Sequence, residues 1–156
     1  MEQYPVRKIE KPIDWCVTVP GSKSMTNMAL LMAALSDGTV TLDGVLFSDD
    51  SRHFISSLTA LGFDVLVEEE KRRVTVKGEG GTIPKKEAEI DVGSAGTAAR
   101  FLTAMLGMSD GSYVIQASGQ MKKRPMKDLF VLLKQTGAEI TWLGQEADLR
   151  VSCTGQ

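Results

Sequence analysis

The chain has 156 residues, of which 42% are hydrophobic and 24% are charged, and its formal net charge at pH 7 is −2. These values are ordinary for one globular domain with a sizeable core, and they argue against nucleic acid or a membrane as a partner. Two isolated cysteines, one histidine and no long apolar window argue against a disulfide framework, a transition-metal site and a membrane span. We therefore expect a cytoplasmic protein.

The first half of the chain predicts the order strand, helix, strand, helix, strand, strand. The strands are expected at residues 16–19, 39–42, 63–67 and 73–77, and the helices at about 25–35 and 51–61. Gly62 suits the position after the second helix, because glycine readily adopts the left-handed conformation that ends many helices. Residues 78–84 are rich in glycine and end in proline, which predicts a linker.

The second half predicts the same order again. Strands are expected at residues 89–92, 112–117, 138–143 and 148–153, with helices at about 97–106 and from Pro125 to just before Gly137. The DGTV sequence at 37–40 matches DGSY at 110–113, and the two halves are offset by about 73 to 75 residues. One domain over residues 1–156 is therefore predicted to contain a βαβαββ unit twice, at about 16–78 and about 88–154.

The hydrophobic patterns predict how the layers are arranged. The helix at 25–35 is apolar nearly all round, so it should be buried on most sides. The strands at 63–67 and 73–77 alternate apolar and polar residues, which predicts one face in water. The expected class is therefore α/β (α+β) with buried helices inside and sheets outside.

Two segments predict anion binding, since each places small residues and a cation at the start of an apolar helix. They are PGSKS at 20–24, which contains Lys23, and GSAGTAAR at 93–100, which ends in Arg100. Free N–H groups and the helix dipole attract anions at such points. Structural alternatives remain open: Lys23 as a solvated lysine, Thr97 as a helix cap, and Arg100 as a paired structural cation.

A third cationic segment, MKKRP at 121–125, precedes another predicted helix. Lys122 and Lys123 are interpreted as solvated, whereas Arg124 stands where the helix dipole repels a cation, so an anion between them is expected. Asp49 and Asp50 are interpreted as first-turn residues of a capped helix. His53 is interpreted as structural or exposed, because the sequence gives it no catalytic partner.

Four segments in register resemble the 5-enolpyruvylshikimate-3-phosphate synthase (EPSP synthase) family. They are the three described above and LFSDD at 46–50, and the resemblance extends over about residues 19–140. The sibling UDP-N-acetylglucosamine enolpyruvyl transferases share the fold, but typically carry lysine–asparagine in the first segment, where Ser24 stands here, and a reactive cysteine near the third. That family remains the alternative within this fold.

The resemblance implies a fold and a reaction. The fold is an inside-out domain of three βαβαββ units that pairs with a second domain, so the chain would lack one unit and the C-terminal domain, and residues 1–14 would be loosely attached. The reaction moves the enolpyruvyl group of phosphoenolpyruvate to the 5-hydroxyl of shikimate 3-phosphate, as part of aromatic amino-acid biosynthesis. It releases phosphate and uses no metal or cofactor.

The resemblance also implies roles for individual residues. Lys23 would contact phosphoenolpyruvate and assist proton transfer, and Ser24 would bind shikimate 3-phosphate. Gly96 would line the phosphoenolpyruvate pocket, where an added side chain would crowd the inhibitor glyphosate. Arg124 would clamp phosphoenolpyruvate.

Other residues would support the site or depart from the family pattern. Thr97 and Arg100 would hold the loop, and Ser94 stands where the family usually has asparagine. Met28 stands where the family usually has an arginine that binds the shikimate carboxylate; losing such a charge-assisted bond costs about 1.5–3 kcal/mol. We expect no turnover by the chain alone. A non-catalytic anion-binding module and a purely structural domain remain alternative functions.

Overall fold

The computed structural model of the chain describes residues 4–6, 8–12, 14–143 and 148–152. The first half contains α1 (Lys23–Leu35), β1 (Asp37–Asp43), α2 (Asp49–Ala60), β2 (Val65–Glu68), the short 3-10 turn η1 (Glu69–Lys71) and β3 (Arg73–Glu79). The second half contains β4 (Glu87–Asp91), α3 (Gly96–Gly107), β5 (Ser112–Gln116), α4 (Gly119–Lys122), α5 (Lys127–Gln135), β6 (Glu139–Leu143) and β7 (Asp148–Ser152).

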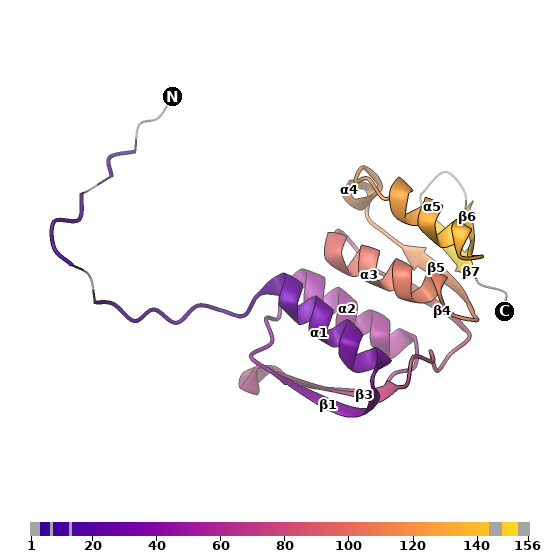
Figure 1. The fold of residues 1–156 in the computed structure, drawn as a ribbon, viewed down its shortest axis with the longest axis horizontal. Helices are drawn as coiled ribbons and strands as arrows, with labels where there is room; N and C mark the ends of the chain where they lie inside the picture. Colours follow the sequence, from indigo (N-terminus) through magenta and orange to yellow (C-terminus); the bar gives the residue numbers. More distant parts are fainter. Residues whose placement is uncertain (1–3, 7, 13, 144–147, 153–156) are drawn as a thin grey trace.

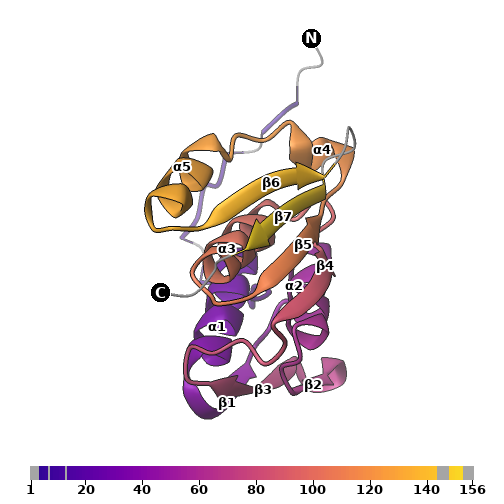
Figure 2. The same ribbon diagram turned by 90° about the vertical axis from the view of Figure 1, so that its right-hand side faces the viewer.

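The helices α1, α2 and α3 contact one another, and the sheets lie outside them (Figure 1). The sheet of the first half packs under α1, while the sheet of the second half is seen in front of α3 in Figure 2. This is the layer order expected from the alternating strands. In β3, for example, Val74 and Val76 are fully buried and the intervening Thr75 is partly exposed.

The two sheets differ at one edge. The first has the order β1-β3-β2 with antiparallel pairs, and the second has the order β4-β5-β7-β6. In the second, β4 runs parallel to β5, and the other pairs are antiparallel. The strand β1 corresponds to β5 in the repeat, but among the described residues it pairs only with β3, so its outer edge is open.

Both halves end their second long helix with the same backbone motif. Gly62 and Gly137 have φ values of +94° and +96°, in the left-handed region that glycine adopts without steric cost. In the first half, the N–H of Phe63 donates to the carbonyl of Leu58, and in the second half that of Ala138 donates to Leu133. These are the bonds of a Schellman C-cap, repeated at the offset that the sequence predicts.

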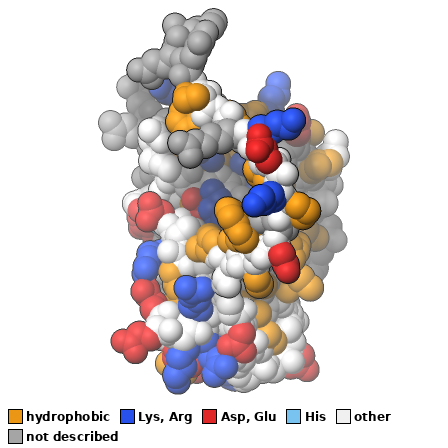
Figure 3. Space-filling model, turned by 90° about the vertical axis from the view of Figure 1, so that its left-hand side faces the viewer, with side chains coloured by type: hydrophobic (Ala, Val, Ile, Leu, Met, Phe, Trp, Pro, Cys, Tyr) orange, Lys and Arg blue, Asp and Glu red, His pale blue; other side chains and the backbone are white. Residues whose placement is uncertain are grey.

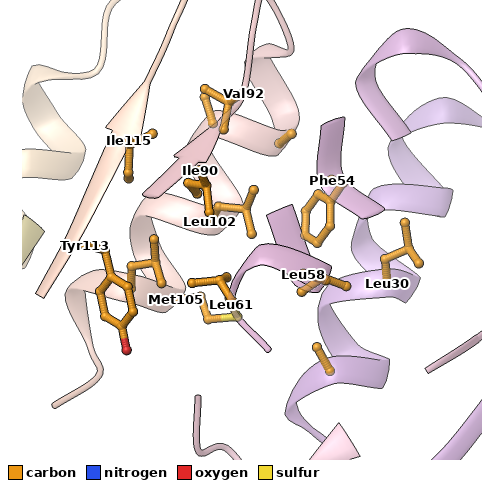
Figure 4. Close-up of a cluster of buried hydrophobic side chains, with 14 of the residues drawn as sticks. Leu30, Phe54, Leu58, Leu61, Ile90, Val92, Leu102, Met105, Tyr113 and Ile115 are labelled. Carbon is orange, nitrogen blue, oxygen red and sulfur yellow. The ribbon is translucent and has the colours of Figure 1, made fainter. Parts of the chain in front are cut away.

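One hydrophobic core joins the two halves (Figure 4). Phe54 and Leu58 of α2 lie between Leu30 of α1 and Leu102 of α3, and all four are fully buried. The larger cluster also contains Leu61, Ile83, Ile90, Val92, Met105, Leu106, Tyr113 and Ile115. Because side chains from both halves interlock, neither half forms a separate core.

The strand expected at residues 16–19 is absent. Val17 and Val19 are more than 70% exposed, and the segment before α1 runs away from the helices (Figure 1). The alternating Val-Thr-Val pattern favours a strand, but a strand requires hydrogen bonds to a neighbour, and no described segment pairs with these residues.

Two helix predictions also need correction. Helix α1 is not buried on most sides, because Met25, Met28, Met32 and Leu35 form an exposed row along it. The helix expected from Pro125 begins at Lys127 instead, and the short α4 precedes it. Ser118 caps α4 by accepting a hydrogen bond from the N–H of Met121. The sequence did not predict this short helix, because the cations that follow Met121 were interpreted as solvated.

Candidate anion-binding site

The N-terminal ends of α1, α2 and α3 meet at one end of the molecule. Lys23, the first residue of α1, forms an ion pair with Asp50 in the first turn of α2, with Nζ and Oδ2 3.3 Å apart. His53, one turn later on α2, contacts the turn that precedes α3. Figure 3 views the left-hand side of Figure 1, where α1 begins, and shows Lys and Arg side chains among acidic and hydrophobic ones.

The three helices differ in how their first turns are capped. The Ser22 hydroxyl accepts a hydrogen bond from the N–H of Met25 in α1, and Ser48 and Ser51 form a reciprocal capping box in α2. Helix α3 follows Ala95, which has no side chain that can cap, and its first turn contains no acidic residue. The N–H groups of its first turn therefore lack a side-chain cap and can donate to a ligand.

Arginines surround the uncapped end of α3. Arg100 donates from Nη1 to the carbonyl of Gly96 at 3.0 Å and from Nη2 to the carbonyl of Pro125 at 3.1 Å. It therefore ties the helix to the segment that carries Arg124. A Cβ added to Gly96 would overlap Nη1 of Arg124, so the Arg124 guanidinium lies directly against the first residue of α3.

This end of α3 carries positive charges that no nearby carboxylate neutralises in the described chain. Neither Arg100 nor Arg124 has a carboxylate within 4.0 Å among residues 4–6, 8–12, 14–143 and 148–152. The helix dipole places a further partial positive charge beside them. An anion bound between the guanidinium groups and the N–H groups of α3 would relieve this repulsion.

Hydroxyl groups hold the turn that precedes α3. Ser94 and Ser118 lie with their Oγ atoms 2.8 Å apart, which links the turn to the start of α4. The N–H of Ser118 also donates to the carbonyl of Gly93 at 2.9 Å. Thr97 is partly buried in the first turn of α3 and does not act as its cap.

The remaining predicted residues lie on α1, apart from the arginines. Ser24 and Met28 are both exposed, one turn apart, on the side of α1 that carries the exposed methionines. Within the described part of the chain, neither of them forms a hydrogen bond or ion pair with Gly96 or Arg124. The structure thus brings Gly96, Arg100 and Arg124 together directly, and it joins Lys23 to this end through α2.

Sequence reasoning missed two residues at this end. Asp50 was interpreted as a first-turn residue of α2, yet it also pairs with Lys23, and its side chain is only 18% exposed. The sequence indicates no partner for His53, yet its Nδ1 lies 3.0 Å from the carbonyl oxygen of Asp91. Acidic residues after a serine cap were a usable signal for Asp50, but a backbone carbonyl gives no signal in a sequence.

Two further observations hold for residues 4–6, 8–12, 14–143 and 148–152. Within these ranges, no three histidine, cysteine or acidic side chains gather closely enough to ligate a metal ion. None of the helices described there combines the length and apolar character needed to cross a bilayer.

Comparisons with known proteins lead to one family. The family model for EPSP synthase (3-phosphoshikimate 1-carboxyvinyltransferase) matches residues 7–156. A 3-phosphoshikimate 1-carboxyvinyltransferase of Trichormus variabilis is 39% identical over 156 residues, which are 100% of this chain and 37% of that protein. One of Sulfurovum sp. is 42% identical over 143 residues, 91% of this chain and 33% of the relative.

The structural comparison leads to the same family. A solved EPSP synthase of Acinetobacter baumannii superposes with a TM-score of 0.76 at 25% sequence identity, over 88% of this chain and 31% of that one. The chain thus spans about 37% of the length of this Trichormus variabilis relative and of a second one from Nostoc sp.. The expected α/β class with outer sheets is confirmed. Because the family model covers almost every residue and the fold agrees, the chain belongs to the EPSP synthase family.

Proposed function

We propose that this chain supplies the N-terminal part of an enzyme that transfers the enolpyruvyl group of phosphoenolpyruvate to the 5-hydroxyl of shikimate 3-phosphate. Phosphate is released, and the product serves aromatic amino-acid synthesis in the cytoplasm. The observation that carries the proposal is the uncapped start of α3, where Gly96 lies against Arg124 and Arg100 without an acidic partner in the described chain.

This arrangement suits phosphoenolpyruvate, a small molecule with a phosphate and a carboxylate. The N–H groups of Gly96, Thr97 and Ala98 precede the first intrahelical bond of α3, which Ala99 donates to Ala95 at 2.8 Å. They can donate to one anionic group while Arg124 contacts the other. Charge-assisted bonds of this kind contribute about 1.5–3 kcal/mol each, enough to hold the substrate in one orientation.

Lys23 is proposed as the group that assists proton transfer, and Asp50 orients its ammonium group. Their ion pair, 3.3 Å long and about half exposed on the lysine side, leaves donors of the ammonium group free for a substrate. Since the chain spans about 37% of its relatives, we propose that residues of the remaining part complete the site. The acidic proton-transfer groups would come from that part.

The shikimate 3-phosphate half of the site is proposed to be weak. Ser24 offers an exposed hydroxyl, but Met28, one turn further along α1, offers only a thioether. A thioether cannot replace the two parallel hydrogen bonds of an arginine to a carboxylate. Replacing Met28 by arginine should therefore tighten binding of shikimate 3-phosphate in a complete enzyme.

The alternative functions predict different partners for Arg100 and Arg124. A purely structural domain should pair Arg100 and Arg124 with acids, and no such pair occurs in the described chain, which favours anion binding. A stand-alone anion-binding module would hold shikimate 3-phosphate tightly without chemistry. The sibling family is disfavoured, because the matching family model is that of EPSP synthase.

The test is a titration of the 15N-labelled chain with phosphoenolpyruvate, followed by amide NMR. We expect the Gly96 and Thr97 signals to move, and we expect Arg124→Ala to weaken this response about tenfold. Lys123→Ala, a change of the neighbouring exposed cation, should leave it intact. Arg124→Ala that lowers stability but not the ligand response would support the structural alternative instead.

A turnover assay completes the test. With both substrates present, the chain alone should release no phosphate above the uncatalysed background. Turnover by a preparation free of host enzyme would show that the chain does not need further residues, which contradicts the proposed division of the site.

A further inference from the structure

The side chain of His53, from the first half of the chain, contacts the turn between β4 and α3. This residue lies on α2 and is partly buried. Its Nδ1 is 3.0 Å from the carbonyl oxygen of Asp91. A carbonyl oxygen only accepts hydrogen bonds, so Nδ1 must carry the proton, and in the neutral ring Nε2 is then unprotonated.

The imidazole also fills the space that Gly93 leaves open. A Cβ added to Gly93 would overlap the ring, with Cε1 of His53 only 2.7 Å away. Gly93 has a φ of +49°, a conformation that side chains rarely adopt. The ring and the bare backbone are thus complementary, and contact between α2 and this turn depends on both residues.

Within the described part of the chain, the other hydrogen bonds of this turn come from the second half. The N–H of Gly93 donates to Oδ1 of Asp91 at 2.8 Å, and the N–H of Ala95 donates to the carbonyl of Val92 at 2.9 Å. Ser118 holds the carbonyl of Gly93 and the hydroxyl of Ser94. His53 therefore links the turn to α2. The same helix holds Lys23 of α1 through its ion pair with Asp50.

We propose that His53 is a positioning residue that fixes the Gly93–Ala95 turn and so sets where the first turn of α3 stands relative to Lys23. It rests on the proposed function in one respect, that the start of α3 binds phosphoenolpyruvate. Gly96 follows the turn directly, so a small shift of the turn moves the N–H groups away from Arg124. Misplacement by about 1 Å is enough to weaken binding strongly.

The first part of the test concerns the turn alone. The 15N chemical shifts of the His53 ring should show that Nδ1 carries the proton in the neutral imidazole. His53→Phe keeps a ring but loses the donor, and it should shift the amide signals of Gly93, Ser94 and Gly96. His53→Asn, whose amide donates from nearly the same place as Nδ1, should restore them, and Ser56→Ala on the exposed side of α2 should change none. Unaltered signals in His53→Phe overturn the inference.

The second part concerns the ligand. His53→Phe should weaken the phosphoenolpyruvate response of Gly96 about tenfold, with His53→Asn close to the parent chain. If His53→Phe does not fold, His53→Ala, which adds no volume, takes its place with the same expected losses. If phosphoenolpyruvate moves no signal of the parent chain, the proposed function fails, while the amide signals of the variants still decide whether His53 holds the turn. Weakening that His53→Asn shares equally with His53→Phe also overturns the inference.

Discussion

At the scale of single residues, Gly96 matters because of the atom that it lacks. Its missing side chain is the space in which the Arg124 guanidinium lies. The atom that a methyl group would displace is the far end of a flexible side chain, not backbone. The fold can therefore tolerate the substitution, but the Arg124 guanidinium would have to move away from Gly96.

We predict that Gly96→Ala changes the free energy of unfolding by less than about 1 kcal/mol but weakens phosphoenolpyruvate binding severalfold. We also expect the added methyl group to crowd the inhibitor glyphosate and to weaken its binding. The measurement is a double-mutant cycle with Arg124→Ala, using denaturation and ligand titration. In the Arg124→Ala background, Gly96→Ala should cost no further affinity; an undiminished loss there would show that the two residues act independently.

Two buried polar side chains lack hydrogen-bond partners in the described chain, so replacing one of them by an apolar residue should increase stability. Thr103 in α3 and Asn27 in α1 are almost completely buried, and their side-chain polar atoms have no hydrogen-bond partner among the described residues. Thr103→Val removes such an unpaired hydroxyl with almost no change of shape, so it should stabilise the chain by about 1 kcal/mol. Chemical denaturation measures this change.

The matched control is Thr26→Val. The Thr26 hydroxyl is also buried, but it accepts a hydrogen bond from the N–H of Leu46 at 3.2 Å. The same substitution should therefore destabilise the chain by about 1 kcal/mol. Equal effects of the two substitutions would show that the hydroxyl of Thr103 is paired in solution.

The sequence indicated candidate site residues, but not the contacts that they make. The cations at 23, 100 and 124 were found because each accompanies a predicted helix start. The pairing of Lys23 with Asp50, and of Gly96 with Arg124, depends on how the helices pack across 27 and 28 residues of chain. Helix periodicity fixes which face is apolar, but not which neighbour meets its end.

At the scale of elements, an ion pair fastens α2 to η1. Arg52 forms two hydrogen bonds with the carboxylate of Glu69, and its guanidinium lies 5.6 Å from the centre of the Phe47 ring. The hydrogen bond from Arg52, with a smaller coulombic contribution, holds the pKa of Glu69 below its ordinary value. The pair is exposed, so salt should screen it.

The lowered pKa predicts a pH dependence. A carboxyl group that ionises more readily in the folded than in the unfolded chain stabilises the fold above its unfolded pKa. That contribution is lost as the pH falls through the folded pKa. Arg52→Gln should raise the pKa of Glu69 toward its ordinary value and remove this contribution. Carboxyl NMR titration of both chains measures it; an unchanged Glu69 midpoint would refute the pairing.

Elements were predicted well where local chemistry decides them. Gly62 and Gly137 mark helix ends, because the left-handed turn that each allows needs only neighbouring residues. Prediction failed where a distant partner decides. The Val-Thr-Val stretch at 17–19 has strand chemistry, but no described strand lies beside it.

At the scale of the whole molecule, the common core predicts cooperative unfolding. Leu102 of the second half is fully buried in the cluster that contains Phe54 of the first. Leu102→Ala should cost about 2–5 kcal/mol, a large share of the roughly 5–15 kcal/mol that stabilises a domain. Because the halves share this core, both sheets should lose stability equally.

Amide signals of Val76 in β3 and Ile115 in β5 report on the two sheets during denaturation. One midpoint for both signals, shifted together in Leu102→Ala, is the expected result. Two midpoints, with only the second sheet affected, would mean that each half folds by itself.

The open edge of β1 carries a separate risk. Its counterpart β5 is flanked on both sides, whereas the outer N–H and C=O groups of β1 face no neighbour in the described chain. An unprotected edge is a template for intermolecular strand addition, the first step toward aggregates and fibrils. The glycine and the aspartates at the ends of β1 act against that growth, so solubility at high concentration depends on these few residues.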